Sequence, residues 1–433
     1  MSAESTPITA SFTPSETAGS PASLPPQSGD VALALSRRGL LVGGAVAASA
    51  LVVAGCAEGS ESSGQDAAPD AAPIMGDDIV AFDGEHQAGI ETPPQAHVAL
   101  VGFNLKTNTT ARGAKALMRL WTEDARRLCT AENPVGSLET ELTQTPASLT
   151  ITCGWGEGFF AKTGAEKPEW LGDVRKYSRD KLRPEWGQTD VVLQICSDDP
   201  LTTAFVMRHM TRASSSYAET AWVQQGFGHA NGSAAKGETA RNLFGQKDGT
   251  VNPHTHEEFM DQVWIDEGRF AGGTAMVVRR IHMNLDTWEE LDRAAREAST
   301  GRKLDTGAPM HGTDEFDPVD LEARDSFGLK AIDPSSHVAR AHPPKDHPEQ
   351  KILRRPFNFN LAPSPDNPGE LSNAGQIFIC FQKDPTKQFE PIQARLDEQD
   401  QLNTWITHIG SAMYYVPAGT SGGSYWGESL LET

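Results

Sequence analysis

The chain has 433 residues, enough to bury a substantial core and to form two domains. It carries 58 Asp and Glu against 37 Lys and Arg, which gives a formal net charge of −21. This balance argues against a nucleic acid partner, because neutralising phosphates requires clustered Lys and Arg. The charge favours solubility and attraction to cationic partners, but it identifies no substrate.

Residues 1–56 predict a targeting region rather than a folded domain. Residues 1–35 are rich in Ser, Thr, Pro and Ala and are expected to be disordered. Arg37 and Arg38 then precede a weakly apolar run, Leu40 to Ala54, which is too short to span a bilayer. Twin arginines before such a run resemble a Tat export signal, although Phe is more common than Leu at position 40. We therefore expect export to the cell envelope, for example the periplasm, or to the extracellular medium.

The apolar run ends in a segment that looks like a lipobox, Val53–Cys56. Lipid attachment at Cys56 and ordinary cleavage nearby, which would release a secreted protein, both remain open. Residues 57–77, rich in Gly, Ser, Ala and Asp, predict a flexible tether. The remaining cysteines form no CxxC pair, so a zinc or iron–sulfur site is not expected. They are predicted to be buried free thiols: Cys129, Cys153, Cys196 and Cys380.

Hydrophobic periodicity predicts alternating strands and helices in residues 78–240. The predicted strands are 97–105, 149–153, 191–196 and 221–227, and the predicted helices are 111–131 and 201–213.

The same order recurs in residues 241–433. Thr287, with Glu290 three residues later, predicts the capped start of a helix. The long segment 301–348, dense in charge and Pro, predicts a loop that carries His337. The predicted strands are 275–285, 353–360, 376–381 and 412–416, and the predicted helices are 287–299 and 386–396.

Two consecutive strand–helix–strand units, occurring twice, form a duplicated βαββαβ pattern. The predicted fold class is therefore α+β, with two tandem ferredoxin-like domains at 78–240 and 241–433. Each domain should have an antiparallel sheet with helices packed on it.

A glycine-bounded acid lies at the start of the second half, in the turn Gly245–Gly249. The glycines permit positive φ and close approach of a flat ligand to Asp248. Most such turns only reverse the chain, so the turn alone is weak evidence of function.

Two further segments carry residues suited to haem chemistry, Ser336–Pro343 and Ile352–Phe359. The imidazole of His337 could ligate haem iron, and the guanidinium of Arg354 could be a fixed cation beside a polarised O–O bond. Taken singly, His337 is more readily explained as a structural histidine, and Arg354 with Arg355 as a solvated pair of arginines.

Together, the three segments resemble the dye-decolorizing peroxidases, haem enzymes that use hydrogen peroxide. The resemblance covers residues 82–433 and is greatest to the exported subgroup that contains the deferrochelatase/peroxidase of bacterial iron uptake. The chain departs from the family pattern at Ala339, where Arg is common, and at Pro356, where Gly is common. Neither change alters a proposed catalytic group.

The resemblance implies haem b, with His337 as the proximal iron ligand and with Asp248 and Arg354 on the distal side. Asp248 would transfer the proton of peroxide, and Arg354 would stabilise the charge on the leaving oxygen. Arg354 would also contact the cofactor, and weaker candidates for haem contact are Gly249, Thr250, Val251, His342, Pro343 and Pro344.

The implied function is reduction of hydrogen peroxide and oxidation of organic one-electron donors through a ferryl intermediate. One alternative is a deferrochelatase that removes iron from haem and leaves the porphyrin intact. Another is a non-catalytic haem-binding lipoprotein. Iron-uptake components and a homo-oligomer are further candidate partners, and the sequence leaves the reductant and the oligomeric state open.

Two other groups of residues have ordinary explanations. His254 and His256 suggest a metal cluster, but other spaced ligands are lacking, so a solvated turn is favoured. Five aromatic residues could relay electrons from large donors, although packing in the core is the favoured interpretation. They are Trp288, Trp405, Tyr414, Tyr415 and Trp426.

Overall fold

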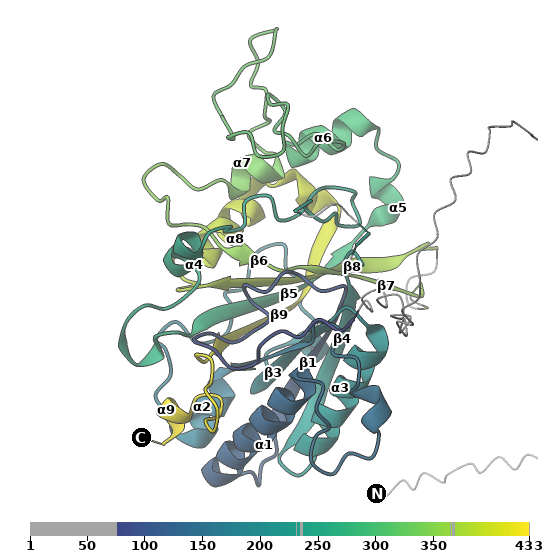
Figure 1. Cartoon of the computed structure of the whole chain (residues 1–433). Helices are drawn as coiled ribbons and strands as arrows, with labels where there is room; N and C mark the ends of the chain where they lie inside the picture. The colour runs from purple at the N-terminus through teal and green to yellow at the C-terminus, as the bar shows by residue number, and fades with distance from the viewer. Residues whose placement is uncertain (1–75, 231, 234–236, 364, 366–368, 433) are drawn as a thin grey trace, which may run out of the picture. The chain divides into compact units, whose positions relative to one another are not determined.

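The computed structural model describes residues 76–230, 232–233, 237–363, 365 and 369–432. The predicted targeting region and nearly all of the predicted tether lie outside these residues. Nine strands of the described part form one sheet, and the chain order within that sheet repeats (Figure 1). The strands are β1 (His97–Leu105), β2 (Thr150–Trp155), β3 (Val191–Ser197), β4 (Ala218–Phe227), β5 (Thr274–Met283), β6 (Leu353–Arg354), β7 (Phe357–Leu361), β8 (Asn373–Gln382) and β9 (Ile406–Val416).

Each half has the strand order of a ferredoxin-like domain. In the first half the order is β2-β3-β1-β4, and in the second half it is β9-β5-β8-β7, with β6 also paired to β8. The pairings within each half are antiparallel, as predicted. The α+β fold with two tandem ferredoxin-like units is therefore confirmed.

The two half-sheets join at both edges, which the sequence pattern does not reveal. One junction pairs Trp155 of β2 with Tyr415 of β9, and the other pairs Phe227 of β4 with Asn358 of β7. Because β5 pairs with both β8 and β9, the strands close into a ring. One face of every strand therefore points to an enclosed core, and the other face is covered by helices or loops.

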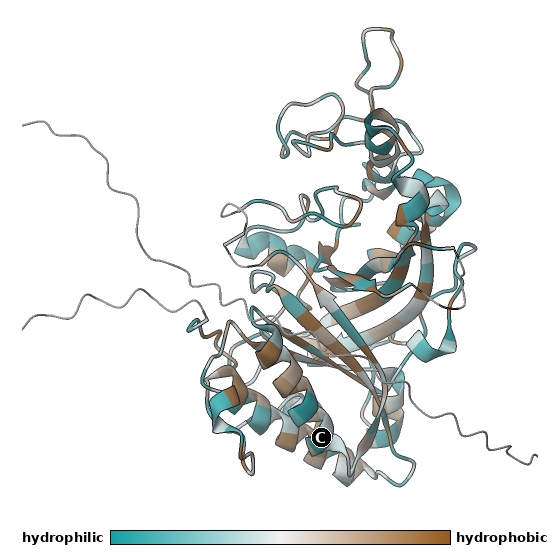
Figure 2. Cartoon of the chain, turned by 90° about the vertical axis from the view of Figure 1, so that its right-hand side faces the viewer, coloured by the Kyte–Doolittle hydropathy of each residue, from teal (hydrophilic) through white to brown (hydrophobic). Residues whose placement is uncertain are grey.

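The alternation of side chains along β3 shows how both faces become apolar. Val191, Leu193 and Ile195 pack in the core under the helices, whereas Val192 and Cys196 pack in the enclosed core. All seven residues of β3 are buried. In Figure 2, hydrophobic residues occur along the strands, whereas the surrounding loops are mostly hydrophilic.

Helices cover the outer face of the first half-sheet, where α1 and α3 pack on β1–β3 (Figure 1). Thr110 caps α1 and Asp199 caps α3, each by accepting a backbone N–H from the first turn. No helix of the described part is long and apolar enough to cross a membrane. The longer helices are α1 (Ala111–Cys129), α2 (Glu157–Thr163), α3 (Pro200–Ser214), α4 (His256–Gln262), α6 (Arg293–Thr300) and α8 (Phe389–Gln399); the shorter ones are α5 (Leu285–Trp288), α7 (His337–Ala341) and α9 (Glu428–Leu431).

Two predicted elements are wrong in detail. The predicted helix 287–299 is two helices, because Asn284 caps α5 and Asp292 caps α6. Thr287 is therefore inside α5 rather than a cap. The predicted strand 353–360 is interrupted between β6 and β7 at Arg355 and Pro356, since Pro has no N–H for a ladder hydrogen bond.

The ordinary explanations for cysteines and aromatics hold in the described residues. Cys129, Cys153, Cys196 and Cys380 are free and buried. Trp288, Tyr414, Tyr415 and Trp426 are at most 1% exposed, and Trp405 packs against the small cluster around Trp288. Thr255, between the two suspected metal ligands, instead forms a capping box with Glu258 at the start of α4.

Candidate active site

A cavity of about 420 Å³ separates α8 from the outer face of the second half-sheet. In the first half the corresponding space is filled by core side chains of α1 and α3. In the second half the facing side chains leave a slot with apolar walls, a size and character typical of small-ligand sites. The walls include Ile281 and Met283 of β5, Phe378 of β8, Ile406 of β9, and Phe389, Ile392 and Leu396 of α8.

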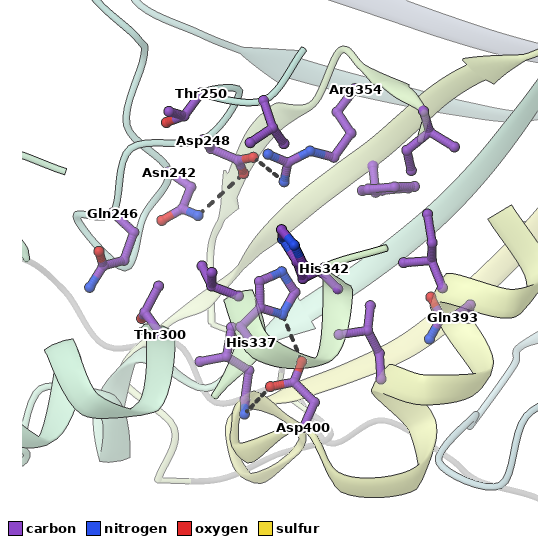
Figure 3. A pocket seen from close by; sticks show the side chains of 18 of the residues that line it. Asn242, Gln246, Asp248, Thr250, Thr300, His337, His342, Arg354, Gln393 and Asp400 are labelled. Carbon is purple, nitrogen blue, oxygen red and sulfur yellow. Dashed lines mark hydrogen bonds and ion pairs between the residues drawn. The ribbon is translucent and has the colours of Figure 1, made fainter. Parts of the chain in front are cut away.

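His337 lies in this cavity as the first residue of α7, so its predicted place on a loop is wrong. Ser336, which is fully buried, is the N-cap of the helix. The Nδ1 atom of His337 is 2.7 Å from Oδ2 of Asp400, at the end of α8. The other ring nitrogen points towards the side of the cavity that holds Asp248 and Arg354 (Figure 3).

The carboxylate of Asp400 sets both the orientation and the proton affinity of this imidazole. Burial alone would lower the pKa of His337, but the charge and hydrogen bond of Asp400 raise it above the ordinary value. Asp400 is itself fixed, because its Oδ1 accepts the backbone N–H of Leu402 at 3.0 Å. An imidazole held through Nδ1 presents Nε2 as a ligand atom, the arrangement that favours metal binding.

Asp248 and Arg354 form an ion pair on the opposite wall, with 2.7 Å between Oδ1 and Nη1 (Figure 3). The other carboxylate oxygen accepts the side-chain amides of Gln376 at 2.8 Å and Asn242 at 3.3 Å. Burial would raise the pKa of Asp248, but Arg354 and the two amides lower it overall. Asp248 is therefore ionised at neutral pH and faces the cavity with a fixed cation beside it.

The turn that carries Asp248 is attached to the strand that carries Arg354. The side chain of Asn252 accepts the backbone N–H of Arg354 at 3.0 Å and donates to its carbonyl at 2.7 Å. This pair of hydrogen bonds mimics a strand partner for β6. The two candidate catalytic residues, 106 positions apart, are thereby held side by side.

The structure brings most of the predicted site residues together. Thr250, Val251, His342 and Pro343 line the same cavity as Asp248, His337 and Arg354, whereas Gly249 and Pro344 do not. Gly249 instead has a φ of +134°, a conformation that L side chains rarely adopt, so its part in the turn is conformational. Burial, followed by the nearby Arg395 and Lys351, lowers the pKa of His342.

Sequence reasoning did not assign roles to three contacting residues, Asp400, Gln376 and Asn242. Asn242 was visible within the motif around the Gly-bounded turn, three positions before Gly245. Asp400 and Gln376 are an ordinary helix-end acid and a strand amide, and no local pattern distinguishes them. Their contacts reach 63 and 128 residues along the chain.

The cavity combines the features required of a haem site in a protein. Its walls are apolar, one imidazole nitrogen is directed into it, and a carboxylate and a guanidinium face that nitrogen from the other side. The class of protein that this fold and site define is therefore an α+β haem enzyme.

Comparison with known proteins identifies the family. The family model for the N-terminal part of Dyp-type peroxidases matches residues 87–228, and the model for the C-terminal part matches residues 239–421. The chain belongs to the Dyp-type peroxidase family. It is a peroxidase, its cofactor is haem, and its substrates are peroxide and an electron donor.

Three similar proteins illustrate the range of this likeness. A dye-decolorizing peroxidase of Thermobifida fusca (strain YX) is 36% identical over 80% of this chain and 84% of its own length. A deferrochelatase of Escherichia coli O157:H7 is 30% identical over 92% of this chain and 97% of its own length. The crystal structure of a DyP-type peroxidase from Cellulomonas bogoriensis is 43% identical, with a TM-score of 0.80, covering 83% of this chain and all of that one.

Proposed function

We propose that His337 binds the haem iron, and that Asp248 and Arg354 carry out the proton and charge chemistry on hydrogen peroxide. The observation that supports this assignment is the His337–Asp400 hydrogen bond across one cavity from the Asp248–Arg354 ion pair. When bound, haem would supply an iron centre that gives two electrons to peroxide and is then reduced again by one-electron donors. The roles of the protein residues follow from their positions.

Cleavage of the peroxide O–O bond to give water requires a proton to move from one oxygen to the other. The ionised Asp248 is able to accept that proton and to return it to the leaving oxygen. Arg354 remains charged at working pH, so it stabilises the negative charge that develops there. The Asp400 carboxylate favours a proton on Nδ1 of His337, so Nε2 is the nitrogen that would bind the iron.

The decisive experiment separates cofactor binding from peroxide chemistry. His337→Ala should lose most of its haem or shift the Soret band, whereas His347→Ala, at an exposed histidine, should not. Asp248→Asn and Arg354→Leu should keep haem but slow the reaction with peroxide, by about a hundred-fold or more in at least one variant. Stopped-flow absorption measures that rate. If both variants reacted as fast as wild type, the assignment of the distal pair would be wrong.

Iron release from haem is a second candidate activity of the same site. It is supported by the likeness to a deferrochelatase along 92% of this chain. Incubation of the protein with haem and a reductant, followed by porphyrin fluorescence, tests it directly. If the protein has this activity, it should form metal-free porphyrin faster than the His337→Ala variant does. Equal rates for the two proteins would show that the activity is absent. A non-catalytic haem carrier is less well supported, because the relatives are named as enzymes.

Export through the Tat pathway, to the cell envelope or the medium, is supported by Arg37 and Arg38 before the weakly apolar run. Lys at both positions should leave precursor in the cytoplasm, and normal export of this double variant would exclude the pathway. Cys56→Ala tests lipid attachment separately. If the cysteine is lipidated, the variant should be released from the membrane fraction, while an unchanged soluble product would indicate ordinary cleavage.

A further inference from the structure

The buried carboxylate of Glu315, outside the cavity, binds the turn that carries Asp248. Oε2 of Glu315 is 2.6 Å from Nζ of Lys247, and Oε1 of Glu315 accepts the hydroxyl of Thr250 at 2.9 Å. Lys247 precedes Asp248 by one residue, and Thr250 follows it by two. The two oxygens of one side chain therefore bind the turn on both sides of the candidate catalytic acid.

The contact between Glu315 and Lys247 is a buried ion pair, so its geometry is restricted. The side chain of Glu315 is 8% exposed and that of Lys247 is 11% exposed. A buried charge is costly unless it is paired and its remaining hydrogen-bond capacity is used. Burial would raise the pKa of Glu315, but Lys247 and the neighbouring hydroxyl groups lower it, so both oxygens act as acceptors.

Glu315 is in turn attached to a rigid support. Nη1 of Arg302 donates to the carbonyl of Glu315 at 2.8 Å and to that of Gly307 at 2.7 Å. A side chain at Gly307 would meet the stem of Lys247 at 2.8 Å, so the two segments are in close contact. The first part of the long charged segment, residues 302–315, is thus locked against the Asp248 turn.

The turn itself needs such support because glycines bound it. Gly245 has a φ of +79° and Gly249 a φ of +134°. Glycine adopts these conformations at little cost, but it also changes to other conformations at little cost. Asp248 has a backbone hydrogen bond of its own, from its N–H to the carbonyl of Ala240. A displacement of about 1 Å in a catalytic group is enough to cost a large factor in rate.

We propose that Glu315 is a positioning residue for the peroxide reaction, which acts by clamping Lys247 and Thr250 so that the Asp248 carboxylate stays aligned with Arg354. This inference rests on the proposed function of Asp248. Glu315 contacts neither His337 nor Asp400 in the structure, so its effect should fall on peroxide chemistry and not on haem binding.

The experiment is a double-mutant cycle in the haem-loaded protein. Glu315→Gln keeps the shape of the side chain but removes its charge towards Lys247, and the matched control is Glu322→Gln, at an exposed ion pair in the same segment. We expect Glu315→Gln to keep the wild-type haem content and Soret band and to lower the rate constant with hydrogen peroxide by about ten-fold or more. In the Asp248→Asn background the same change should have little further effect, because the two residues act through one group.

Each other outcome overturns the proposal in a distinguishable way. If Asp248→Asn is slow and Glu315→Gln is as fast as wild type, the clamp is not required, while the proposed function stands. If the two effects multiply in the double variant, Glu315 acts independently of Asp248. If Asp248→Asn itself reacts at the wild-type rate, the proposed role of Asp248 fails, and positioning through it fails as well.

A second pair of variants covers the case in which Glu315→Gln does not fold. Thr250→Val removes one of the two contacts without leaving a buried charge unpaired, and Thr250→Ser retains the hydroxyl. At matched haem loading, the valine variant should react with peroxide more slowly than the serine variant, because only the serine variant keeps the hydrogen bond to Glu315. Equal rates for these two variants would contradict the clamp.

Discussion

At the scale of single residues, three neighbouring side chains determine the protonation state of the Asp248 carboxylate. One oxygen pairs with Arg354, and the other accepts the amides of Gln376 and Asn242. Each of these contacts stabilises the ionised form, and together they outweigh the effect of burial on its pKa. The residue is thereby kept as a base in the pH range where a buried acid would otherwise be protonated.

Gln376→Leu should therefore raise the pKa of Asp248. Protonation removes the base, so the rate with peroxide falls at low pH, and in the variant this fall should begin at a higher pH than in wild type. Gln393→Leu, which removes an amide from the α8 wall of the cavity, is the matched control. Stopped-flow rates across the acidic range test the shift. An unchanged acid limb in Gln376→Leu would show that this hydrogen bond does not control the titration.

Asp400→Asn should weaken haem retention and change the Soret band, because the hydrogen bond to His337 loses its charge. In the haem-free protein the raised pKa of His337 has a second consequence. The ion pair stabilises the fold fully below the ordinary histidine pKa of 6.5, and this contribution is lost as the pH rises through the raised folded-state value.

The loss of stability in Asp400→Asn should accordingly be greatest in mildly acidic solution, at about 1.5–3 kcal/mol, and shrink above that range. Denaturant unfolding of the haem-free protein at several pH values measures it. Asp346→Asn, at an exposed carboxylate, should show no such dependence. If the destabilisation by Asp400→Asn increased with pH, the pKa of His337 would not be raised in the folded protein.

At the scale of elements, α7 is too short to be stable by itself, because helix nucleation is costly and five residues add few hydrogen bonds. It depends on its cap and on α8. Ser336 caps its first turn. The guanidinium of Arg340 donates to the backbone carbonyl of Arg395 on α8, and the guanidinium of Arg395 donates to the backbone carbonyl of Arg340. The orientation of His337 is therefore a property of α7 and α8 together.

Ser336→Ala should reduce stability by about 1 kcal/mol and speed the loss of haem to a scavenger protein. The reason is that the first turn of α7, which includes His337, loses its capping hydrogen bond. Ser335→Ala, one residue earlier, is the control and should behave like wild type. Equal rates of haem transfer for the two variants would mean that the cap does not hold the ligand.

At the scale of the whole described part, two narrow junctions join the half-sheets. The junction at Trp155 and Tyr415 is covered by the C-terminal segment, where Gly427 has a φ of +68°. A Cβ at Gly427 would be 1.9 Å from Cη2 of Trp155. That atom belongs to a buried ring, which has no room to move.

Gly427→Ala should therefore lower the free energy of unfolding by about 2–4 kcal/mol, from overpacking and from the unfavourable positive φ. Gly422→Ala, where a Cβ would meet nothing within 4 Å, should be nearly neutral. Thermal and denaturant unfolding of the two variants make the comparison. Similar stabilities would show that the junction tolerates repacking.

The fold was largely predictable because most of its elements have a local cause. Strands buried on both faces, such as 97–105 and 191–196, contain apolar runs that identify them directly. The amphipathic helix at 111–131 was predicted to within two residues of α1. The failures at Thr287 and at Arg355–Pro356 came from local competition, between alternative caps and between strand pairing and a proline.

The amino-acid sequence by itself determined the family, through short motifs, and the duplicated α+β pattern, through hydrophobic periodicity. The same motifs mark the three candidate site residues Asp248, His337 and Arg354. Only the tertiary structure decided which other groups complete the site. Asp400, Gln376 and Glu315 carry no local pattern, and their contacts join segments 63 to 128 residues apart. The closure of the two half-sheets and the gap between α8 and the sheet set those distances, and both depend on packing across the whole chain.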